Sequence, residues 1–562
     1  MSFRFSSVTG INFRKLIFYY FIISILTLLV LFPDLVFFMR NNVINYAISG
    51  FVIVQLLLLV PVFFFSKMLR VYYWILAILV AFIPVMLMSV MYMNIQVNAE
   101  MVGLVLDTSV DEVTELLGWK IVLMMLAMAF CFFVFIKLSY RLPSKISWKQ
   151  GLIISLIGLL SYLVIPLIRT TDMRYYSSIL KNTYRTFYPF RLQSVFGLLS
   201  EELTNVKRYK EVTKDFTFDA ANKDTADQQR RIFVLVLGEA SRADHWHING
   251  YQRETSPEIE KLNDLISYKN VVSGGTMTII SIPLLVTRAT PDNYGRHTKE
   301  KSILAAFKEA GFYTAWISNQ AHYGLSGNIG MHFSDGDTAI YISHGENETN
   351  FTGTYDQSIL PVLSGVIKSQ SNKDIFLIVH LIGSHWRYIL RYPPAFGKFA
   401  PTAGRNQLNM INPTKEEIIN EYDNSVLYTD YILKSIADTL QKFDAESGFL
   451  FVSDHGENLN DKNDNTYFHS YKPTRYTAEV PLFIWLNENY IQNNPQVIQA
   501  LRSNQDKKVS SALNVFYTMV DLGKISIQGF DSTASLADQS FVEPGRIILG
   551  DAGKIYHYKD LE

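Results

Sequence analysis

Residues 232–242 read IFVLVLGEASR, and residues 449–456 read FLFVSDHG. Each stretch is a short apolar run, rich in β-branched and aromatic side chains, that ends abruptly in polar residues. Continuous apolar runs of this length are typical of strands that are buried on both faces of a parallel sheet. In such α/β folds, ligands bind beyond the carboxyl ends of the strands. The two stretches therefore predict an α/β domain whose site contains Glu239, Asp454 and His455.

Further apolar runs alternate with helix-length segments in the same part of the chain. They lie at residues 313–317, 375–382 and 482–485. Strands that alternate with helices indicate a mainly parallel sheet with helices on both faces, here within residues 231–562. The polar residues at the ends of these runs, at 318–320 and 380–385, are then expected at the same edge of the sheet.

The residues at this edge have the chemistry of a metal centre. Carboxylate oxygens of Glu239 and Asp454 and an imidazole nitrogen of His455 are good zinc ligands. Between them in sequence, Thr278 lies in SGGTMTIISIP (273–283), where glycines allow close approach of an anion ahead of an expected helix. A threonine hydroxyl is a poor nucleophile, but coordination to zinc lowers its pKa. Thr278 is therefore a candidate nucleophile, although a purely structural turn has the same composition.

The apolar content of the chain is concentrated in its first third, although 49% of all 562 residues are hydrophobic. We expect five membrane-spanning helices, at residues 16–38, 43–65, 71–93, 121–136 and 151–168. About 20 residues are needed to cross a bilayer, so the first three stretches are long enough. The last two are short, and each by itself also fits a buried core helix. Residues 1–168 are thus predicted to form a five-helix transmembrane domain.

Basic residues in alternate loops predict the orientation of these helices, because Lys and Arg are retained on the cytoplasmic side. They precede the first span, separate the second from the third, and separate the fourth from the fifth: Arg4, Arg14, Lys15, Lys67, Arg70, Lys137, Arg141, Lys145 and Lys149. The connection between the third and fourth spans is acidic instead. The amino terminus is therefore expected in the cytoplasm and the large carboxyl-terminal domain in the periplasm.

Residues 169–230 connect the two expected domains. Aromatic and basic side chains alternate in the first part, which suits helices in the lipid headgroup region, and an amphipathic linker packed on the soluble domain fits equally well. The polar stretch 211–231 reads as an exposed tether. The only cysteine, Cys131, lies in the fourth apolar stretch, so the soluble domain has no disulfide. The 51 basic and 51 acidic residues form no basic block, which argues against nucleic acid as a partner.

Several motifs recur in the order and spacing of a known family. They are GExxR (238–242), NGYxRxTxP (249–257), GTMTxxSxP (275–283), HxxGSH (380–385), YDNSVxYxD (422–430) and DHGEN (454–458), followed by His469. In these motifs the chain resembles the membrane phosphoethanolamine transferases, which include lipid A modifying and mobile colistin-resistance enzymes. The resemblance implies five spans followed by an alkaline-phosphatase-like or sulfatase-like periplasmic domain. It also implies that Glu239, Thr278, Asp454 and His455 hold a catalytic zinc ion and that Thr278 carries phosphoethanolamine.

Other residue roles rest on the same resemblance. His385 and His469 match histidines near the phosphoryl group, where they bind a second zinc ion, hold the phosphate or transfer a proton. His380 matches a further histidine that binds substrate. In the loop between the third and fourth spans, Thr108 and Glu112 resemble a donor-binding stretch, although the family's asparagine is missing. Many relatives also brace the soluble domain with disulfides, which this chain lacks.

The resemblance implies transfer of phosphoethanolamine from phosphatidylethanolamine to an outer-membrane glycolipid, with release of diacylglycerol. The acceptor is expected to be a lipid A phosphate or the lipooligosaccharide core, and polymyxin resistance is expected to follow. The chain is expected in the bacterial inner membrane, as a monomer. Alternatives are the same chemistry on periplasmic glucans, a phosphoglycerol transferase or sulfatase-like hydrolase, and, more remotely, a non-catalytic membrane receptor.

Overall fold

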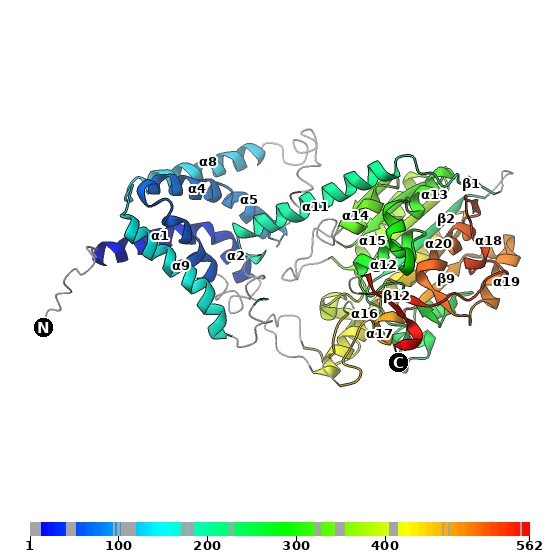
Figure 1. Cartoon of the computed structure of the whole chain (residues 1–562). Helices are drawn as coiled ribbons and strands as arrows, with labels where there is room; N and C mark the ends of the chain where they lie inside the picture. Colours follow the sequence, from blue (N-terminus) through cyan, green and yellow to red (C-terminus); the bar gives the residue numbers. More distant parts are fainter. Residues whose placement is uncertain are drawn as a thin grey trace. The chain divides into compact units, whose positions relative to one another are not determined.

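The computed structural model describes residues 13–40, 52–93, 96–97, 102, 120–169, 177, 185–223, 229–320, 327–342, 354–403, 414–463, 466–469, 472–550 and 553–561. The chain forms two compact units, and the division between them falls after Leu199. Figure 1 shows the elements of both units. Thr108 and Glu112, the two residues expected to contact the lipid donor, lie outside the described residues.

The first unit consists of apolar helices. They are α1 (Phe13–Val30), α2 (Phe32–Arg40), α4 (Leu69–Ala81), α5 (Ile83–Met88), α8 (Lys120–Ser139) and α9 (Trp148–Arg169). Three segments are long and apolar enough to cross a membrane, namely Phe13–Val30, Ser66–Met91 and Val122–Ser139, while Val52–Val62 and Trp148–Val164 are shorter. Within the described residues, the structure therefore supports a membrane unit, but it does not confirm five full spans.

These helices expose apolar side chains, as helices in contact with lipid do. On α8, Phe130 is 69% exposed and Phe133 is 66% exposed. The unit also contains a buried carboxylate, Asp34, at the start of α2. Asp34 accepts hydrogen bonds from Gln96 Nε2 at 2.9 Å, from the Tyr188 backbone N–H at 2.7 Å and from Arg191 Nη1 at 3.0 Å. This network joins the segment before α11 (Phe190–Thr213) to the first membrane helices.

Part of the stretch expected as an exposed tether, within residues 211–223, packs on the second unit. Helix α11 continues to Thr213, and β1 (Ala221–Asn222) pairs antiparallel with β11 (Ile525–Ser526). Phe218 is fully buried in the core of the second unit. A single apolar residue in a polar stretch is a weak sequence signal, yet burying one Phe contributes about 2 kcal/mol. The prediction of an exposed tether was therefore wrong for these residues.

A seven-stranded sheet forms the centre of the second unit, in the order β3-β9-β8-β2-β7-β5-β6. Their bounds are β2 (Arg231–Gly238), β3 (Ile266–Tyr268), β5 (Tyr313–Ser318), β6 (Thr338–Tyr341), β7 (Ile375–His380), β8 (Glu446–Ser453) and β9 (Leu482–Leu486). Neighbouring strands from β8 to β6 are parallel, whereas β9 is antiparallel to both β8 and β3.

The sheet is therefore mixed, and the expectation of a mainly parallel sheet needs this correction. The connection from β8 to β9 stays at the carboxyl edge of β8, as the hydrogen bond from the Ser453 N–H to the Pro481 carbonyl indicates. Strand β9 must then start at that edge and run back. An apolar run buried on both faces carries no sign of its direction, so the sequence could not reveal this reversal.

Side chains of β2 alternate between two apolar cores, because successive residues of a strand point to opposite faces. Phe233, Leu235 and Leu237 join the core that contains α12 (Thr278–Val286), α13 (Ile303–Glu309) and α20 (Ser511–Leu522). Ile232, Val234 and Val236 join the core that contains α15 (Ile359–Ser369) and α16 (Lys415–Leu440). Helices thus cover both faces of the sheet, as predicted (Figure 1). The carboxyl edge is left for polar side chains.

Candidate active site

The pairing of β2 with β8 brings Glu239 and Asp454 together. Gly238, the last residue of β2, lies opposite Ser453, the last residue of β8, so Glu239 and Asp454 follow at the same edge. Gly238 is needed at this point, since a Cβ atom would lie 2.7 Å from the Phe451 ring. Glu239 is 1% exposed and Asp454 is fully buried. Two carboxylates thus share one buried site.

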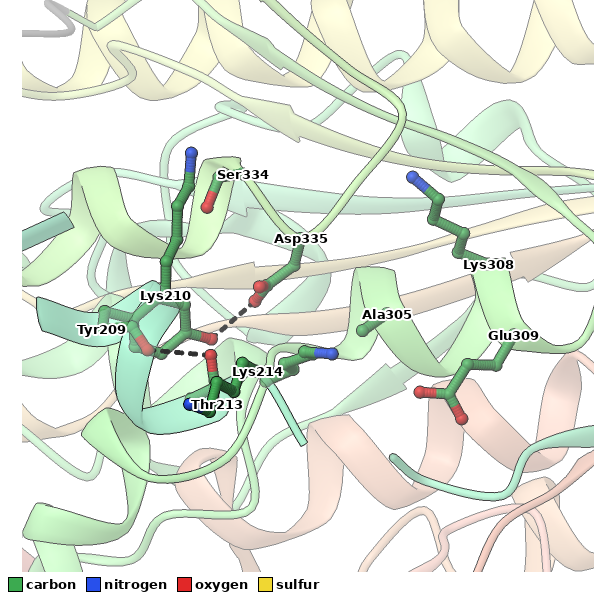
Figure 2. A pocket seen from close by; sticks show the side chains of 10 residues that line it. Tyr209, Lys210, Thr213, Lys214, Ala305, Lys308, Glu309, Ser334 and Asp335 are labelled. Atoms are coloured by element: carbon green, nitrogen blue, oxygen red, sulfur yellow. Dashed lines mark hydrogen bonds between the residues drawn. The ribbon is translucent and has the colours of Figure 1, made fainter. Parts of the chain in front are cut away.

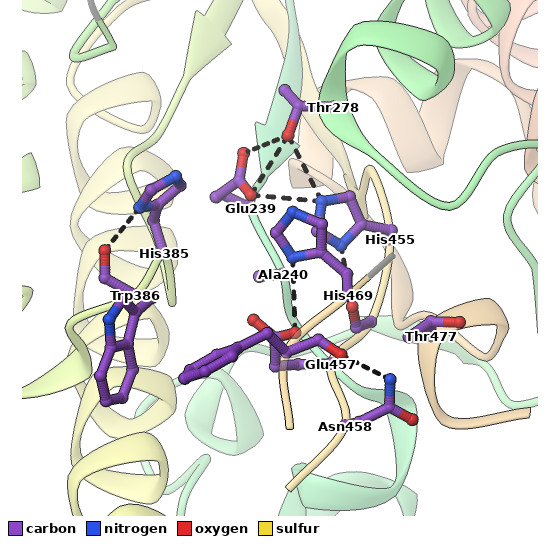
Figure 3. Close-up of polar contacts among 12 residues, drawn as sticks. Glu239, Ala240, Thr278, His385, Trp386, His455, Glu457, Asn458, His469 and Thr477 are labelled. Atoms are coloured by element: carbon purple, nitrogen blue, oxygen red, sulfur yellow. Dashed lines mark hydrogen bonds and ion pairs between the residues drawn. The ribbon is translucent and has the colours of Figure 1, made fainter. Parts of the chain in front are cut away.

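Glu239, Asp454 and His455 form a cluster that could hold a metal ion. One ligand atom from each residue lies within 4.8 Å of the others. Thr278, the first residue of α12, points its hydroxyl at this cluster (Figure 3). Its Oγ1 lies 3.1 Å from Glu239 Oε2, 3.3 Å from Glu239 Oε1 and 3.3 Å from His455 Nε2. The four residues expected to bind zinc therefore converge on one point.

The hydrogen bonds of the cluster leave metal-binding atoms free. Asp454 Oδ1 accepts the N–H groups of Ala240 at 3.1 Å and His455 at 2.7 Å, while buried Oδ2 has no hydrogen-bond partner among the described residues. His455 Nδ1 lies 2.8 Å from the Gly456 carbonyl, which can only accept, so Nδ1 carries hydrogen and Nε2 can offer its lone pair. Oδ2 has only a 3.4 Å ion pair with His455 Nε2, which is weak compensation for a buried carboxylate oxygen, and a bound cation would replace it. The donor set thus fits zinc.

Electrostatics within the cluster lead to the same conclusion. Burial raises the pKa of Asp454 to about 7, and the charge of Glu239 adds to this effect. Burial also opposes ionisation of Glu239, but the hydrogen bond and charge of His455 outweigh it and hold the pKa of Glu239 well below its usual range. Although burial lowers the pKa of His455, Asp454 and Glu239 raise it to about 10. Without metal, a proton on His455 balances part of the negative charge, and a bound cation would replace it.

His469 lies directly beside this cluster. Its ring centroid is 4.2 Å from that of His455, and its Nδ1 is 3.4 Å from Glu457 Oε1 (Figure 3). Glu457 is fully buried, and neither carboxylate oxygen has a hydrogen-bond partner of ordinary geometry among the described residues. Sequence reasoning quoted Glu457 within a motif and gave it no role. Its contact with His469 depends on the path of the loop after β8.

The two histidines after β7 have different surroundings. His385 is half-buried, and its Nδ1 lies 2.7 Å from the Trp386 carbonyl, so Nε2 remains available (Figure 3). His380 is 1% exposed and lies opposite Leu237 of β2. Neither nitrogen of His380 has a hydrogen-bond partner among the described residues, and burial lowers its pKa to about 4. The imidazole of His380 is therefore neutral at pH 7.

The loop after β7 is held close to Glu239. Gly383 has φ +48°, and a Cβ atom there would lie 3.0 Å from the backbone nitrogen and oxygen of Glu239. The buried carboxylate of Asp356 accepts the N–H groups of Ile382 at 2.9 Å and Gly383 at 3.0 Å, and Asn319 Nδ2 at 2.8 Å. Sequence reasoning missed Asp356, which follows no apolar strand. Its role appears only once β5 and β7 are known to be neighbours.

A cavity of about 380 Å³ lies elsewhere in the second unit, between the end of α11 and α13 (Figure 2). Four lysines line it, namely Lys210, Lys214, Lys301 and Lys308. Carboxylates offset this charge: Asp335 and Glu309 line the same cavity, Lys214 pairs with Glu211, and Lys308 pairs with Asp337. The cavity contains none of the expected site residues. We therefore assign the chemistry to the carboxyl edge of the sheet.

Comparisons with known proteins identify relatives of this chain. Residues 231–525 match the sulfatase family. Phosphoethanolamine transferase EptC from Escherichia coli is 29% identical over 339 residues, which is 58% of this chain and 56% of EptC. The match thus spans little more than half the length of that relative.

Solved structures extend the likeness. The periplasmic domain of Escherichia coli EptC, solved in complex with Zn, is 26% identical with a TM-score of 0.54 and covers 61% of this chain and 96% of that domain. The integral membrane protein lipooligosaccharide phosphoethanolamine transferase A (EptA) from Neisseria meningitidis is 23% identical with a TM-score of 0.50 and covers 93% of this chain and 98% of EptA. The second likeness covers most of this chain and supports a membrane-spanning part ahead of the soluble domain.

Since the family match covers more than half of the chain and the solved EptC domain has the same fold at a TM-score of 0.54, the expected alkaline-phosphatase-like or sulfatase-like fold is confirmed. The chain belongs to the sulfatase family and, within it, resembles the membrane phosphoethanolamine transferases.

Proposed function

We propose that the chain transfers phosphoethanolamine from phosphatidylethanolamine to an outer-membrane glycolipid, through a covalent intermediate on Thr278. The observation that supports this most directly is the position of the Thr278 hydroxyl, 3.1–3.3 Å from Glu239 and His455 within the buried acidic cluster. The names of the relatives support the same transferred group. Glu239, Thr278, Asp454 and His455 are the proposed ligands of one zinc ion.

Zinc bound by these residues would act as a Lewis acid and lower the pKa of a coordinated hydroxyl. The Thr278 oxygen attacks phosphorus, the bond from phosphorus to the glycerol oxygen breaks, and diacylglycerol leaves after its oxygen takes up a proton. The acceptor oxygen then attacks the same phosphorus, loses its proton and releases Thr278. The position of Thr278 as the first residue of α12 helps, because the helix dipole favours a phosphoryl group there.

His385 and His469 are the proposed partners of the phosphoryl group and of the transferred protons. Both act on the charge of Glu239, so they lie within electrostatic reach of the cluster. His455 Nδ1 is committed to the Gly456 carbonyl, whereas His469 Nδ1 makes no hydrogen bond within the part of the chain that the structure describes. These two histidines are also the proposed ligands of a second zinc ion. His380, neutral and buried, is proposed to contact the substrate side of the site.

The membrane unit leads to a proposal on the location of the chain and on its lipid substrates. We propose that residues 1–168 span the bacterial inner membrane with the amino terminus in the cytoplasm, and that residues 231–562 form the catalytic domain in the periplasm. Thr108 and Glu112 are the proposed contacts of the lipid donor. The proposed acceptor is a lipid A phosphate or the lipooligosaccharide core, reached by a monomer at the membrane surface, with polymyxin resistance as the expected phenotype.

Mass spectrometry of the full-length protein tests this proposal. After incubation with phosphatidylethanolamine in detergent, phosphoethanolamine is expected on Thr278, together with released diacylglycerol. Thr278→Ala should lose both the adduct and the transfer. Thr276→Ala is a matched control, because Thr276 is equally buried and its Oγ1 has no hydrogen-bond partner among the described residues. Transfer by Thr278→Ala would overturn the proposal, and release of free ethanolamine phosphate alone would indicate a hydrolase.

A further inference from the structure

We infer that Gln320 is a positioning residue for Glu239: it fixes the rotation of the Glu239 carboxylate at the metal cluster. This inference rests on the proposed zinc site. Gln320 follows β5, two strands away from β2 in the sheet, and it is 2% exposed. Its Nε2 donates to Glu239 Oε2 at 2.8 Å and to the Leu381 carbonyl at 2.9 Å.

The chemistry of the partners determines the orientation of the amide. A carboxylate and a carbonyl can only accept, so the NH₂ group of Gln320, and not its oxygen, must face both of them. Both hydrogens of that NH₂ group are then used, one for the end of β2 and one for the loop after β7. A Glu at position 320 would have the same shape, but it would bring a further negative charge and no donors at neutral pH.

The backbone around Gln320 is itself held firmly. Ser318 Oγ donates to the Gln320 carbonyl at 3.1 Å and accepts the Gln320 N–H at 3.0 Å. Asn319 donates to Asp356 at 2.8 Å, and Asp356 in turn holds the loop after β7 through two N–H groups. The Gln320 amide therefore projects from a rigid strand end, and little conformational freedom is lost when it binds Glu239.

The consequence is a fixed rotation of the Glu239 carboxylate. Oε2 accepts the Gln320 amide at 2.8 Å and lies 3.1 Å from Thr278 Oγ1, while Oε1 lies 3.4 Å from His455 Nε2. Without Gln320, the carboxylate could rotate about its last bond and Oε2 would lose its only amide donor. Partners that orient metal ligands in this way are typically worth 10- to 100-fold in metal affinity. Gln320 thus acts through Glu239 and does not need to touch the substrate.

The test is zinc affinity of the full-length protein, measured by competition with a chromophoric chelator, so that it does not depend on transferase activity. Gln320→Met keeps the length of the side chain and removes the donors, and its zinc Kd is expected to rise about 10- to 100-fold. Gln320→Asn keeps the amide but is shorter by one methylene, and it is expected to fall between the wild type and Gln320→Met. Asn504→Leu is the matched control, because the buried Asn504 amide donates to two carbonyls, Leu536 at 3.0 Å and Asp538 at 2.9 Å, outside the cluster.

Asn504→Leu should lower thermal stability and leave zinc Kd unchanged. If both Gln320 variants bind zinc as the wild type does and lose only stability, Gln320 is a structural residue and the inference is wrong. If zinc Kd is unchanged and only KM for the lipid donor rises, Gln320 contacts substrate, which also overturns it. If the variants weaken zinc binding while the wild type transfers no phosphoethanolamine, the positioning role stands and the proposed function fails.

Discussion

Asp454→Asn tests whether Asp454 binds the metal ion or only holds the backbone N–H groups beside it. Asp454 Oδ1 accepts two backbone N–H groups, from Ala240 and His455, whereas Oδ2 has no hydrogen-bond partner among the described residues. In the variant, the amide oxygen must keep the two N–H groups, because only an acceptor satisfies them. The NH₂ group then takes the place of Oδ2. The substitution thus removes one anionic metal donor and leaves the backbone contacts intact.

Two effects of opposite sign are expected. The pKa of Asp454 in the folded protein is raised from 3.8 to about 7. A carboxyl group with a raised folded pKa destabilises the fold above its unfolded pKa, so the variant without metal should be more stable at pH 7.5, by at most ~4 kcal/mol. Part of this gain is offset, because Asp454 also holds the pKa of His455 near 10 and thereby stabilises protonated His455 in the folded protein. Zinc binding, by contrast, should weaken. The binding free energy of a structural zinc site is about 10–16 kcal/mol and is shared by four ligands, so the loss of one ligand should raise Kd roughly 100-fold.

Thermal unfolding of the full-length protein in detergent measures both effects. Fluorescence of Trp246, Trp316 and Trp485, all buried in the second unit, reports unfolding of that unit. At a zinc concentration of about 100 times the wild-type Kd, the wild type should gain about 2.7 kcal/mol. With a Kd about 100-fold higher, the variant should gain only about 0.4 kcal/mol.

Asp430→Asn provides the control for this prediction. Burial also raises the pKa of Asp430 to about 7, and its carboxylate accepts the N–H groups of Glu258 and Ile259, both at 2.8 Å. This variant should respond to zinc as the wild type does. The reasoning is refuted if Asp454→Asn is less stable than the wild type in chelator and still gains ~2 kcal/mol or more from zinc.

Two other substitutions test the loop beside Glu239 and a buried histidine of the second unit. Gly383→Ala should lower the free energy of unfolding by about 1–3 kcal/mol and raise zinc Kd in a chelator competition, because the new Cβ meets the Glu239 backbone at 3.0 Å. Gly311→Ala is the control: with φ +92° and open space around it, it should lose stability from backbone strain and keep the zinc Kd of the wild type. Burial lowers the pKa of His297 from 6.5 to about 3, so the folded protein favours neutral His297. The contribution of His297 to the free energy of unfolding should therefore be fully present above pH 6.5 and fall by roughly 2 kcal/mol between pH 6.5 and 5. His297→Gln should flatten this dependence in thermal unfolding, and an unchanged slope would contradict the assignment to His297.

The site illustrates how far strand-end reasoning reaches. Glu239 and Asp454 could be predicted together because each follows an apolar run that must be buried, and buried parallel strands end at one edge. His455 followed from its place beside Asp454. Thr278 was harder to predict, since a small-residue turn before a helix is common in proteins without any catalytic role. The structure brings its hydroxyl to 3.3 Å from His455 Nε2.

Gln320, Asp356 and Glu457 could not be assigned in the same way. Gln320 stood at a strand end, yet its role depends on β5 lying next to β7 and β7 next to β2. Asp356 precedes α15 in a polar stretch and reaches the site only through backbone N–H groups of another strand end. Glu457 acquires its neighbour His469 from the course of a loop. None of these pairings leaves a pattern in residue spacing.

The sequence by itself determined that an apolar helical part precedes an α/β domain, and that carboxylates and an imidazole end two of its buried strands. Which segments will be buried can be read from local composition and from the spacing of apolar residues along the chain. The order of the strands, the reversal of β9 and the polar contacts around Glu239 were decided only by the tertiary structure. Those features depend on which segments, far apart in the chain, pack side by side, and hydrogen bonds between them exist only after that packing is complete.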